Sequence, residues 1–426
     1  MIVFFKSLFL CVALNGLIAP FAIAQAQLDE LISRALENNP EINMKRYESQ
    51  AAKTKISVAR QLPDPEITIA AMNVPTNFNL TSEQMTMVPQ VTVMQMLPWF
   101  GKLSAAGNAA KYSYNASRDQ LSNASLEVVA MVKKVYAEIY AAQKTLAYLE
   151  YKKKLFDGVL KTTNQLFAVG LAPQQDVFRA AAELTMAQSE IITMNGMLQQ
   201  QYDELAVLVG SNEPLMIEID TLQLQQLLTL STLDSTLVEN NPSLSQMSNI
   251  KESAKAQNSF ARSDAIPDFR VGIGYGYRGA EMPDGTKAPN MINFEIGISV
   301  PIFFESKQNK MIEETKLMEQ AADQEYRATS LSLRNQLRSM YADAEAKYQI
   351  IPLYSEQLIP QYVATYDASI TAYSVGKTSF TMLIDNLKML VNAKIELVKI
   401  ESSYFSTEAE ISKLIGENSE RYRGEK

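Results

Sequence analysis

The stretch FRVGIGYGYRG, residues 269–279, alternates between two kinds of side chain. From position 269 to 277 its odd-numbered residues are apolar or aromatic, and between them its even-numbered residues are arginine or glycine. Successive side chains of a β-strand point to opposite faces, so this pattern predicts a strand with one apolar face. NFEIGISVPIF, residues 293–303, repeats the alternation. The sequence therefore predicts two long, two-faced strands in a chain whose other patterns are mainly helical.

The composition favours few, long elements and disfavours several classes of function. The chain of 426 residues has only 16 glycines and 16 prolines, and its single cysteine, Cys11, has no partner for an internal disulfide. Histidine, the usual general base near neutral pH and the commonest metal ligand, is absent from the sequence. A formal charge of -8 is the wrong sign for nucleic acid. We therefore expect no enzymatic activity, no cofactor and no nucleic-acid partner.

Residues 1–24 have the features of an export signal. Lys6 supplies a positive charge, an apolar run follows, and Ala22, Ile23 and Ala24 match an A-x-A cleavage site. A transmembrane helix is the alternative interpretation, but the run is short and ends at a cleavage-like site. We therefore expect the mature chain to begin at Gln25.

Several short motifs occur twice in the same order. ALENNPEI at residues 35–42 returns as LVENNPSL at 237–244, and LPDPEITI at 62–69 returns as IPDFRVGI at 266–273. Similarity at a nearly constant offset indicates a repeated structural plan. The predicted divisions of the chain are the signal 1–24, a first repeat 25–210, a linker 211–232, a second repeat 233–416 and a flexible tail 417–426.

Each repeat has the same predicted order of a helix, two strands and two long helices. In the first repeat, Asn39 and Pro40 are typical of an N-cap and a first helical position. Each strand pair is followed by a helical hairpin. The predicted strands cover residues 65–74, 90–97, 269–279 and 293–303, and the predicted hairpins cover residues 102–210 and 306–416.

The first hairpin has the pattern of a coiled coil. The run from Lys102 to Val169 has no proline, and a helix of that length would reach about 100 Å. Gly170 and Pro173 then predict a tight turn into the returning helix. Apolar residues step by four and three along the run, which is the heptad pattern. They are Val128, Val132, Val135, Ile139, Ala142, Leu146 and Leu149.

The strands have the length and the two faces expected of a membrane barrel. A tilted strand crosses a bilayer in about 9 to 11 residues, with its apolar face toward lipid. Four strands per chain cannot close a barrel, and open edges are not tolerated in hydrocarbon. Two chains would give eight strands, whose interior side chains fill, whereas three would give twelve strands around an open lumen. The pattern therefore predicts an assembly in contact with outer-membrane lipid.

Aromatic residues follow the second strand of each pair. Trp99, the only tryptophan, comes after Pro98, and Phe303 and Phe304 come after Pro301. These three aromatics are either membrane-interface residues or residues packed at a corner between strand and helix.

Four methionines lie close together in the sequence, at Met85, Met87, Met94 and Met96. Thioethers can bind monovalent copper, although methionine more often serves as an adaptable filler. The sequence does not decide between these two roles.

These features together resemble the TolC family of outer-membrane efflux ducts. The resemblance covers roughly residues 28 to 416 and is carried by the repeat, the strand pairs and two turn motifs, FAVGLAPQQDV at 167–177 and YSVGKTSFTMLIDN at 373–386. It implies a fold that is mainly α with membrane β, in which a trimer forms a 12-stranded β-barrel. A long coiled-coil α-helical barrel continues it across the periplasm.

The resemblance also implies a function and its partners. Such a homotrimer serves as the exit duct of a tripartite efflux pump, together with a periplasmic adaptor protein and an inner-membrane pump. A type I protein secretion duct and a periplasmic coiled-coil scaffold are the alternative functions. Neither the exported substrate, nor the particular pump and adaptor, nor the tightness of the resting gate follows from the sequence.

Candidate gate and docking residues follow from the resemblance by counting from the VG of each turn. Asp176 falls at the family's gate aspartate, and Tyr373 at the tyrosine that bonds to it. Asp385 matches an aspartate that rings the closed aperture. Two positions depart from the family, because Met382 replaces the first ring aspartate and Thr378 replaces the gate arginine. The implied adaptor-docking residues are Val169, Gly170, Leu171, Val375, Gly376 and Lys377.

Overall fold

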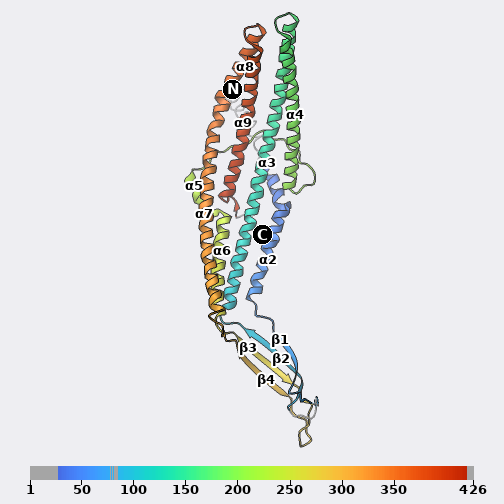
Figure 1. Ribbon diagram of the computed structural model, residues 1–426, viewed down its shortest axis with the longest axis vertical. Coiled ribbons are helices and arrows are strands. Elements are labelled where there is room, and N and C mark those ends of the chain that lie inside the picture. The colour runs from blue at the N-terminus through green and yellow to red at the C-terminus, as the bar shows by residue number, and fades with distance from the viewer. Residues whose placement is uncertain (1–26, 77, 79, 81–84, 420–426) are drawn as a thin grey trace, which may run out of the picture. The chain divides into compact units, whose positions relative to one another are not determined.

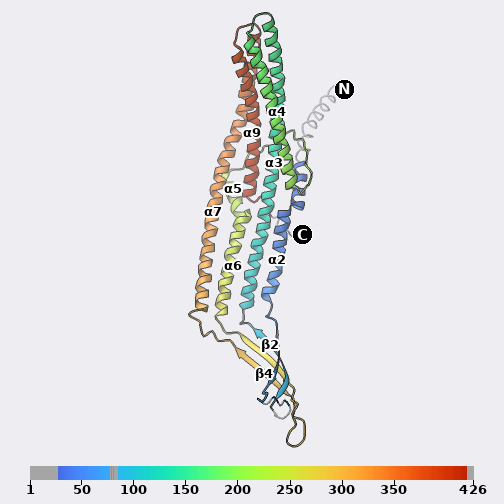
Figure 2. The ribbon, with the colours of Figure 1, turned by 45° about the vertical axis from the view of Figure 1, so that its right-hand side comes forward.

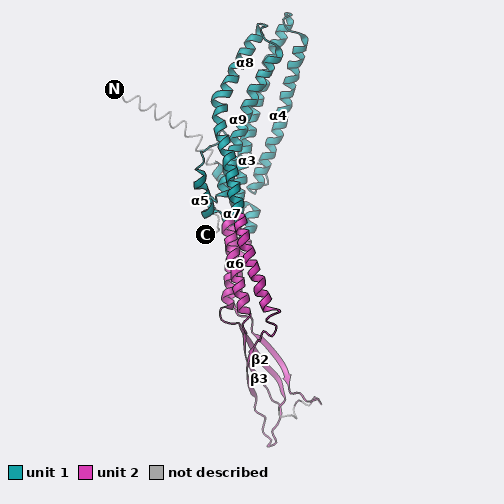
Figure 3. Cartoon of the chain, turned by 60° about the vertical axis from the view of Figure 1, so that its left-hand side comes forward, with its two compact units in different colours: residues 1–46, 121–242, 330–426 teal, residues 47–120, 243–329 magenta. Residues whose placement is uncertain are grey.

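The computed structural model describes residues 27–76, 78, 80 and 85–419 of the chain (Figures 1 and 2). The predicted signal at 1–24 and most of the predicted tail lie outside these residues. The described chain forms two compact units, shown in different colours in Figure 3. Residues 47–120 and 243–329 form one unit, called here the sheet unit, and the remaining residues form the hairpin unit.

The sheet unit contains one antiparallel sheet with the strand order β1-β2-β3-β4. The strands are β1 Glu66–Met72, β2 Met87–Leu97, β3 Phe269–Gly276 and β4 Met291–Ile298. The register joins Ile67 to Val93, Val93 to Ile273 and Ile273 to Phe294, so one apolar row crosses all four strands. The sheet therefore has four strands per chain, two from each repeat, as predicted.

All four strands differ from the predicted ones at one end or both, and β3 ends at Gly276 rather than at residue 279. β4 ends at Ile298 rather than at residue 303, because the Asp268 N–H donates to the Ser299 hydroxyl at 2.8 Å and Pro301 has no N–H to continue a ladder. β2 begins three residues earlier than predicted, at Met87. Its first residues remain paired because the Val88 N–H donates to the Tyr277 carbonyl.

The two faces of the sheet have reversed exposure compared with an ordinary soluble protein. Ile296 is 84% exposed on the apolar face, whereas Gln90 and Thr92 on the polar face are only 6% and 8% exposed. Three glycines of β3 make this possible, since the Thr92 hydroxyl and the Met87 sulfur occupy the space that a Cβ at Gly274 or Gly276 would need. The polar face is thus filled by side chains of β2.

Helices make up most of the rest of the described chain. Residues 27–38 are helical and precede the first labelled helix. The labelled helices are α2 Pro40–Arg60, α3 Lys102–Ala168, α4 Gln174–Leu208, α5 Leu230–Asn240, α6 Pro242–Asp264, α7 Gln308–Pro352, α8 Ile359–Ser374 and α9 Phe380–Leu414. No helix among the described residues combines the length and the apolar character needed to cross a membrane.

The hairpin unit contains the predicted coiled-coil packing. Of the seven predicted heptad residues, all except Leu146 are buried. α4 runs back along the second part of α3, and α9 runs beside α8 (Figures 1 and 2). Between α7 and α8, residues Leu353–Leu358 form a single π-helical segment flanked by Pro352 and Pro360, each of which lacks an amide hydrogen for the helical ladder.

The predicted repeat also appears in matching polar contacts of the hairpin unit. The Asn39 side chain caps α2 by accepting from the Glu41 N–H at 2.9 Å, and its amide donates to the Leu208 carbonyl at 3.2 Å. The Asn241 amide donates to the Leu414 carbonyl at 2.7 Å. In each repeat the asparagine just before the helix that leads to the strands, α2 or α6, therefore anchors the end of the last helix.

The inter-repeat linker packs on α9 beside a buried acid. The Tyr404 hydroxyl donates to the Gln225 carbonyl, and one carboxylate oxygen of Glu408 has no hydrogen-bond partner within the described residues. Burial raises the pKa of Glu408 to about 7, with Lys133 opposing this shift and Glu417 adding to it. Between pH 4.5, the ordinary value, and about 7, the folded chain holds a proton that the unfolded chain has lost. This carboxyl group therefore makes folding less favourable as the pH rises through that window.

We expect Glu408→Gln to raise the melting temperature at pH 8 and to change it little at pH 5. The amide removes the cost of burying the carboxylate charge at pH 8. At pH 5 the carboxyl group of the folded chain is protonated, so there is little charge to remove. Thermal unfolding followed by circular dichroism at both pH values measures the effect. Glu396→Gln, at an exposed position on the same helix, is the matched control and should have no pH-dependent effect. Equal stabilisation by Glu408→Gln at pH 5 and pH 8 would contradict the assignment.

Candidate functional site

The two predicted turn motifs form the ends of the helical hairpins. Gly170 and Gly376 adopt φ values of +75° and +71°, which favour glycine, and each donates its N–H to the carbonyl three residues before it. Apolar side chains at both turns are exposed to solvent. They are Val169, Leu171 and Val375, and Lys377 is exposed beside them.

Both turns line one surface pocket in the hairpin unit. Its walls include Pro173 and Asp176 from the first turn and Tyr373 and Thr378 from the second. The structure therefore brings the predicted gate aspartate and the predicted gate tyrosine into one pocket of a single chain. The pocket is built on an apolar base, because Tyr373 packs against Phe380 with ring centroids 5.9 Å apart.

The environment of both groups disfavours their charged forms. Asp176 is 8% exposed, and burial raises the pKa of its carboxyl group, an effect that Arg179 partly offsets. Tyr373 is 5% exposed, and burial raises the pKa of its phenol, an effect that the neighbouring Thr163 hydroxyl partly offsets and the charge of Asp176 increases. Thr163 lies beside the phenol, but no hydrogen bond of good geometry joins the Tyr373 hydroxyl to any described residue. An acceptor that reached this hydroxyl would therefore satisfy a donor that is now buried without one.

The other predicted gate residues lie on the N-terminal turns of α9. Ser379 caps this helix by accepting from the Met382 N–H at 3.3 Å, and the Thr378 hydroxyl lies 3.2 Å from the Met382 sulfur. Asp385 and Met382 are both exposed. Asp385 thus projects from the α9 surface and does not line the pocket that contains Asp176.

Two polar contacts between the hairpins were not predicted from the sequence. The Lys388 ammonium lies 2.5 Å from a Glu183 carboxylate oxygen, and Arg179 donates to the Thr381 hydroxyl at 3.5 Å. They join α4 of the first hairpin to α9 of the second. The available signal was the spacing of Asp176, Arg179 and Glu183, which puts one base between two acids along one face of α4.

The predicted interface aromatics have different environments. Trp99 is half-buried and stacks on Phe269 with ring centroids 5.8 Å apart, so it packs at the corner between a strand and a helix. Phe303 is exposed, and Phe304 is less so. Of the three, Phe303 has the environment that best suits contact with lipid.

The four methionines are not equivalent in the structure. Met85 and Met96 are exposed, whereas Met87 is buried because its side chain lies across Gly276. Met94 pairs with Glu66 and Gly272 on the polar face of the sheet. Met87 therefore fills the space beside Gly276, which agrees with the packing role of methionine.

A sheet with an exposed apolar face, attached to repeated coiled-coil hairpins, defines the class of outer-membrane channel proteins with a helical extension. The family model described as "Outer membrane efflux protein" matches residues 31–211 and 233–417 of the chain. The protein belongs to this family. The two matched segments correspond closely to the two predicted repeats.

Named relatives and solved structures agree with this assignment. The chain is 24% identical over 223 residues to the multidrug resistance outer membrane protein MdtP of Escherichia coli K12, a match that covers 52% of the chain and 46% of MdtP. The chain thus spans about half the length of this relative. It is 20% identical over 371 residues to the probable outer membrane lipoprotein SilC of Salmonella typhimurium, a match that covers 84% of the chain and 79% of SilC.

Solved structures share the fold at low sequence identity. A membrane protein from Pseudomonas aeruginosa is similar with a TM-score of 0.79 and 18% identity, covering 92% of this chain and 90% of that one. VceC of Vibrio cholerae is similar with a TM-score of 0.76 and 18% identity, covering 92% and 96%. CusC has a TM-score of 0.76 and 17% identity, covering 92% of both chains.

Family membership confirms several predictions from the sequence. It confirms the resemblance to outer-membrane efflux proteins and the location in the outer membrane with a long periplasmic part. It also confirms the mainly helical fold with four membrane strands per chain. The family consists of channel proteins rather than enzymes, in agreement with the composition.

Proposed function

We propose that this protein is the exit duct of a tripartite efflux pump and passes small molecules across the periplasm and the outer membrane. Three chains form the duct, and their sheets close a barrel of about twelve strands with an open lumen. The observation that carries the proposal is the exposed apolar face of a sheet whose two edge strands, β1 and β4, have no outer neighbour in the described chain. Lipid covers the face, and neighbouring chains pair the edges.

The alternative functions have less support. A periplasmic scaffold leaves the apolar face of the sheet without a covering layer. Export of small molecules is favoured over protein secretion because a relative is named for multidrug resistance. The periplasmic adaptor is proposed to dock at the hairpin turns, where Val169, Leu171 and Val375 present apolar side chains to solvent. The inner-membrane pump then acts through this adaptor.

The assembly is tested by extraction of the mature protein in mild detergent. We expect a trimer by size-exclusion chromatography with light scattering, and stepwise conductance after reconstitution into planar bilayers. A monomer that remains stably inserted in bilayers contradicts the proposal. Trimers that conduct no ions even when the gate residues are mutated also contradict it.

Asp385 is proposed to control ion selectivity at the periplasmic aperture. Three exposed carboxylates around one opening would concentrate negative potential and favour cations. We expect Asp385→Asn to reduce the cation selectivity and the block by multivalent cations, both measured from reversal potentials and currents in planar bilayers. Asp367→Asn, at an exposed acid on α8 of the same hairpin, serves as the matched control. Unchanged reversal potentials in Asp385→Asn channels would place this residue away from the aperture.

A further inference from the structure

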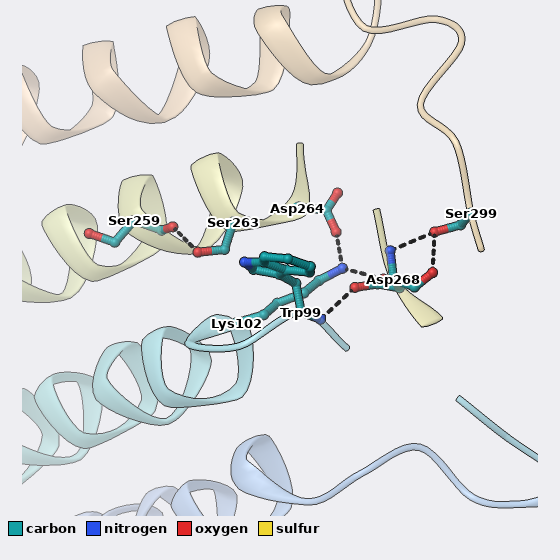
Figure 4. Close-up of polar contacts among 7 residues, drawn as sticks. All are labelled: Trp99, Lys102, Ser259, Ser263, Asp264, Asp268 and Ser299. Carbon is teal, nitrogen blue, oxygen red and sulfur yellow. Dashed lines mark hydrogen bonds and ion pairs between the residues drawn. The ribbon is translucent and has the colours of Figure 1, made fainter. Parts of the chain in front are cut away.

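A partly buried cluster of one lysine and two aspartates joins the two repeats where the sheet meets the helices. The Lys102 ammonium, at the start of α3, lies 2.5 Å from an Asp264 carboxylate oxygen and 2.8 Å from an Asp268 carboxylate oxygen (Figure 4). The Lys102 side chain is only 13% exposed. The backbone N–H of Trp99 donates to the same Asp268 carboxylate at 2.8 Å. The segment after β2 is therefore held to the segment before β3, and we call this contact the repeat junction.

The first repeat contains the counterpart of one of the two acids of the repeat junction. Asp64 occupies in LPDPEITI the place that Asp268 occupies in IPDFRVGI, just before the first strand of its repeat. The surrounding contacts match as well. Gln95 donates to the Pro63 carbonyl at 2.8 Å, and Ser299 accepts from the Asp268 N–H at 2.8 Å, so in both repeats the end of the second strand bonds to this Pro-Asp segment.

The second repeat carries a lysine near the matching place. The segment after β4 leads through Pro301 to α7, as the segment after β2 leads through Pro98 to α3. Counted from these prolines, Glu305 takes the place of Lys102, and Lys307 lies two residues further on, just before the helix begins at Gln308. Asp64 and Lys307 are both exposed, and neither side chain forms an ion pair or hydrogen bond within the described residues. The next lysine, Lys310, is already paired with Glu313 at 2.7 Å on its own helix.

Asp64 and Lys307 cannot take part in the same strand-to-strand contact within one chain. Asp64 precedes β1 and Lys307 follows β4, and these strands form opposite edges of the sheet. β2 is the second strand of the first repeat and β3 is the first strand of the second repeat. The same succession occurs again only between β4 and the β1 of another copy.

We infer that Lys307 and the Asp64 of a neighbouring copy form a second repeat junction between subunits. The occupant of the free edge is a second copy of this chain, because the unpaired charges at the two edges are complementary and the internal repeat supplies the pattern for their contact. A second pair of opposite charges accompanies the first. Arg60 ends α2 as Asp264 ends α6, and Glu305 lies two residues before Lys307. Arg60 of one copy and Glu305 of its neighbour are therefore expected to lie at the same junction.

The internal junction also defines the register between subunits. Leu97 pairs with Phe269 across β2 and β3. In the repeat, Pro98 matches Pro301 and Asp268 matches Asp64. The equivalent of the Leu97–Phe269 pair is therefore Val300 opposite Pro65 of the neighbouring copy. Ile296 then lies opposite Ile69, and both side chains belong to the exposed apolar face of the sheet. A shift of one residue would instead pair an apolar face with a polar one.

Charge reversal tests the junction, which rests on the proposed trimer. Asp64→Lys and Lys307→Asp are each expected to lower the temperature at which the detergent-extracted trimer dissociates, because each puts like charges together. The double variant is expected to recover most of the loss. Asp64→Lys combined with Lys310→Asp is the matched control and should recover nothing. If the dissociation temperature of the double variant is lowered by the sum of the two single effects, the inferred contact is wrong. The proposed trimer would not be affected by that result.

Disulfide formation provides the second measurement. Cys11 is the only native cysteine and lies in the predicted signal, so Ile69→Cys and Ile296→Cys would be the only thiols of the processed chain. Under mild oxidation we expect covalently linked trimers from this pair and none from Ala70→Cys with Ile296→Cys. The reverse result would overturn the inferred register. A wild-type protein that is monomeric in detergent would overturn the proposed trimer and the junction together.

Discussion

Ile296→Arg is expected to prevent most of the protein from reaching the outer membrane as a folded trimer. Ile296 is 84% exposed and lies in the apolar row of β4, where no protein atoms cover it. An arginine at the middle of the bilayer costs about 2 to 4 kcal/mol in a membrane barrel. Three copies would cost on the order of 6 to 12 kcal/mol if the effects add, which is comparable to the whole stability of a typical domain. The fraction of heat-resistant trimer in isolated outer membranes, measured by gel electrophoresis, shows the effect.

Asn293→Arg is the matched control for this prediction. Asn293 lies on the same strand, three residues away and on the opposite face, where it pairs with Gly274. The polar face is expected to surround a wet lumen, in which an arginine remains solvated. The amount of trimer should therefore stay close to that of the wild type. Equal losses in both variants would mean that the two faces of β4 do not differ in their contact with lipid, and the assignment of the faces would be wrong.

The sheet was the most predictable part of the fold. The alternation from residue 269 onward predicted which side chains share a face, because strand geometry alone decides that. The strand ends were less predictable, since they depend on tertiary contacts. Ser299 keeps the alternation of β4 in the sequence, yet its hydroxyl accepts the Asp268 N–H that a continuing ladder would give to a backbone carbonyl. Hydrogen bonds between segments distant in the sequence leave no local pattern.

The candidate site was predictable in its positions and not in its contacts. Gly170 and Gly376 were predicted because a left-handed turn conformation favours glycine. The ion pair between Glu183 and Lys388 was missed, because it requires knowing which faces of α4 and α9 meet. Lys102 was likewise overlooked as the centre of the repeat junction. A lysine at the start of a helix does not by itself predict an ion pair, and its partners Asp264 and Asp268 are distant in the sequence.

A latch between Asp176 and Tyr373 is expected to hold the resting gate closed. The two groups share one pocket, and the buried Tyr373 hydroxyl has no partner there within the described residues. A bond from this phenol to a carboxylate is worth about 1.5 to 3 kcal/mol. Three symmetric latches could then contribute on the order of 4 to 9 kcal/mol, enough to move a gate from mostly closed to mostly open. Because the resemblance to the family implies a gate arginine at the position of Thr378, we expect this pair to bear more of the closure here.

We therefore expect Tyr373→Phe and Asp176→Ala each to raise the resting conductance of single channels in planar bilayers. The double variant should conduct little more than either single variant, since each change already breaks the same bond. Tyr366→Phe is the matched control, because Tyr366 is a buried tyrosine seven residues earlier on α8 and belongs to the same apolar core. Conductance increases that simply add in the double variant would show that the two residues act separately, and the latch would then have to lie elsewhere in the turns.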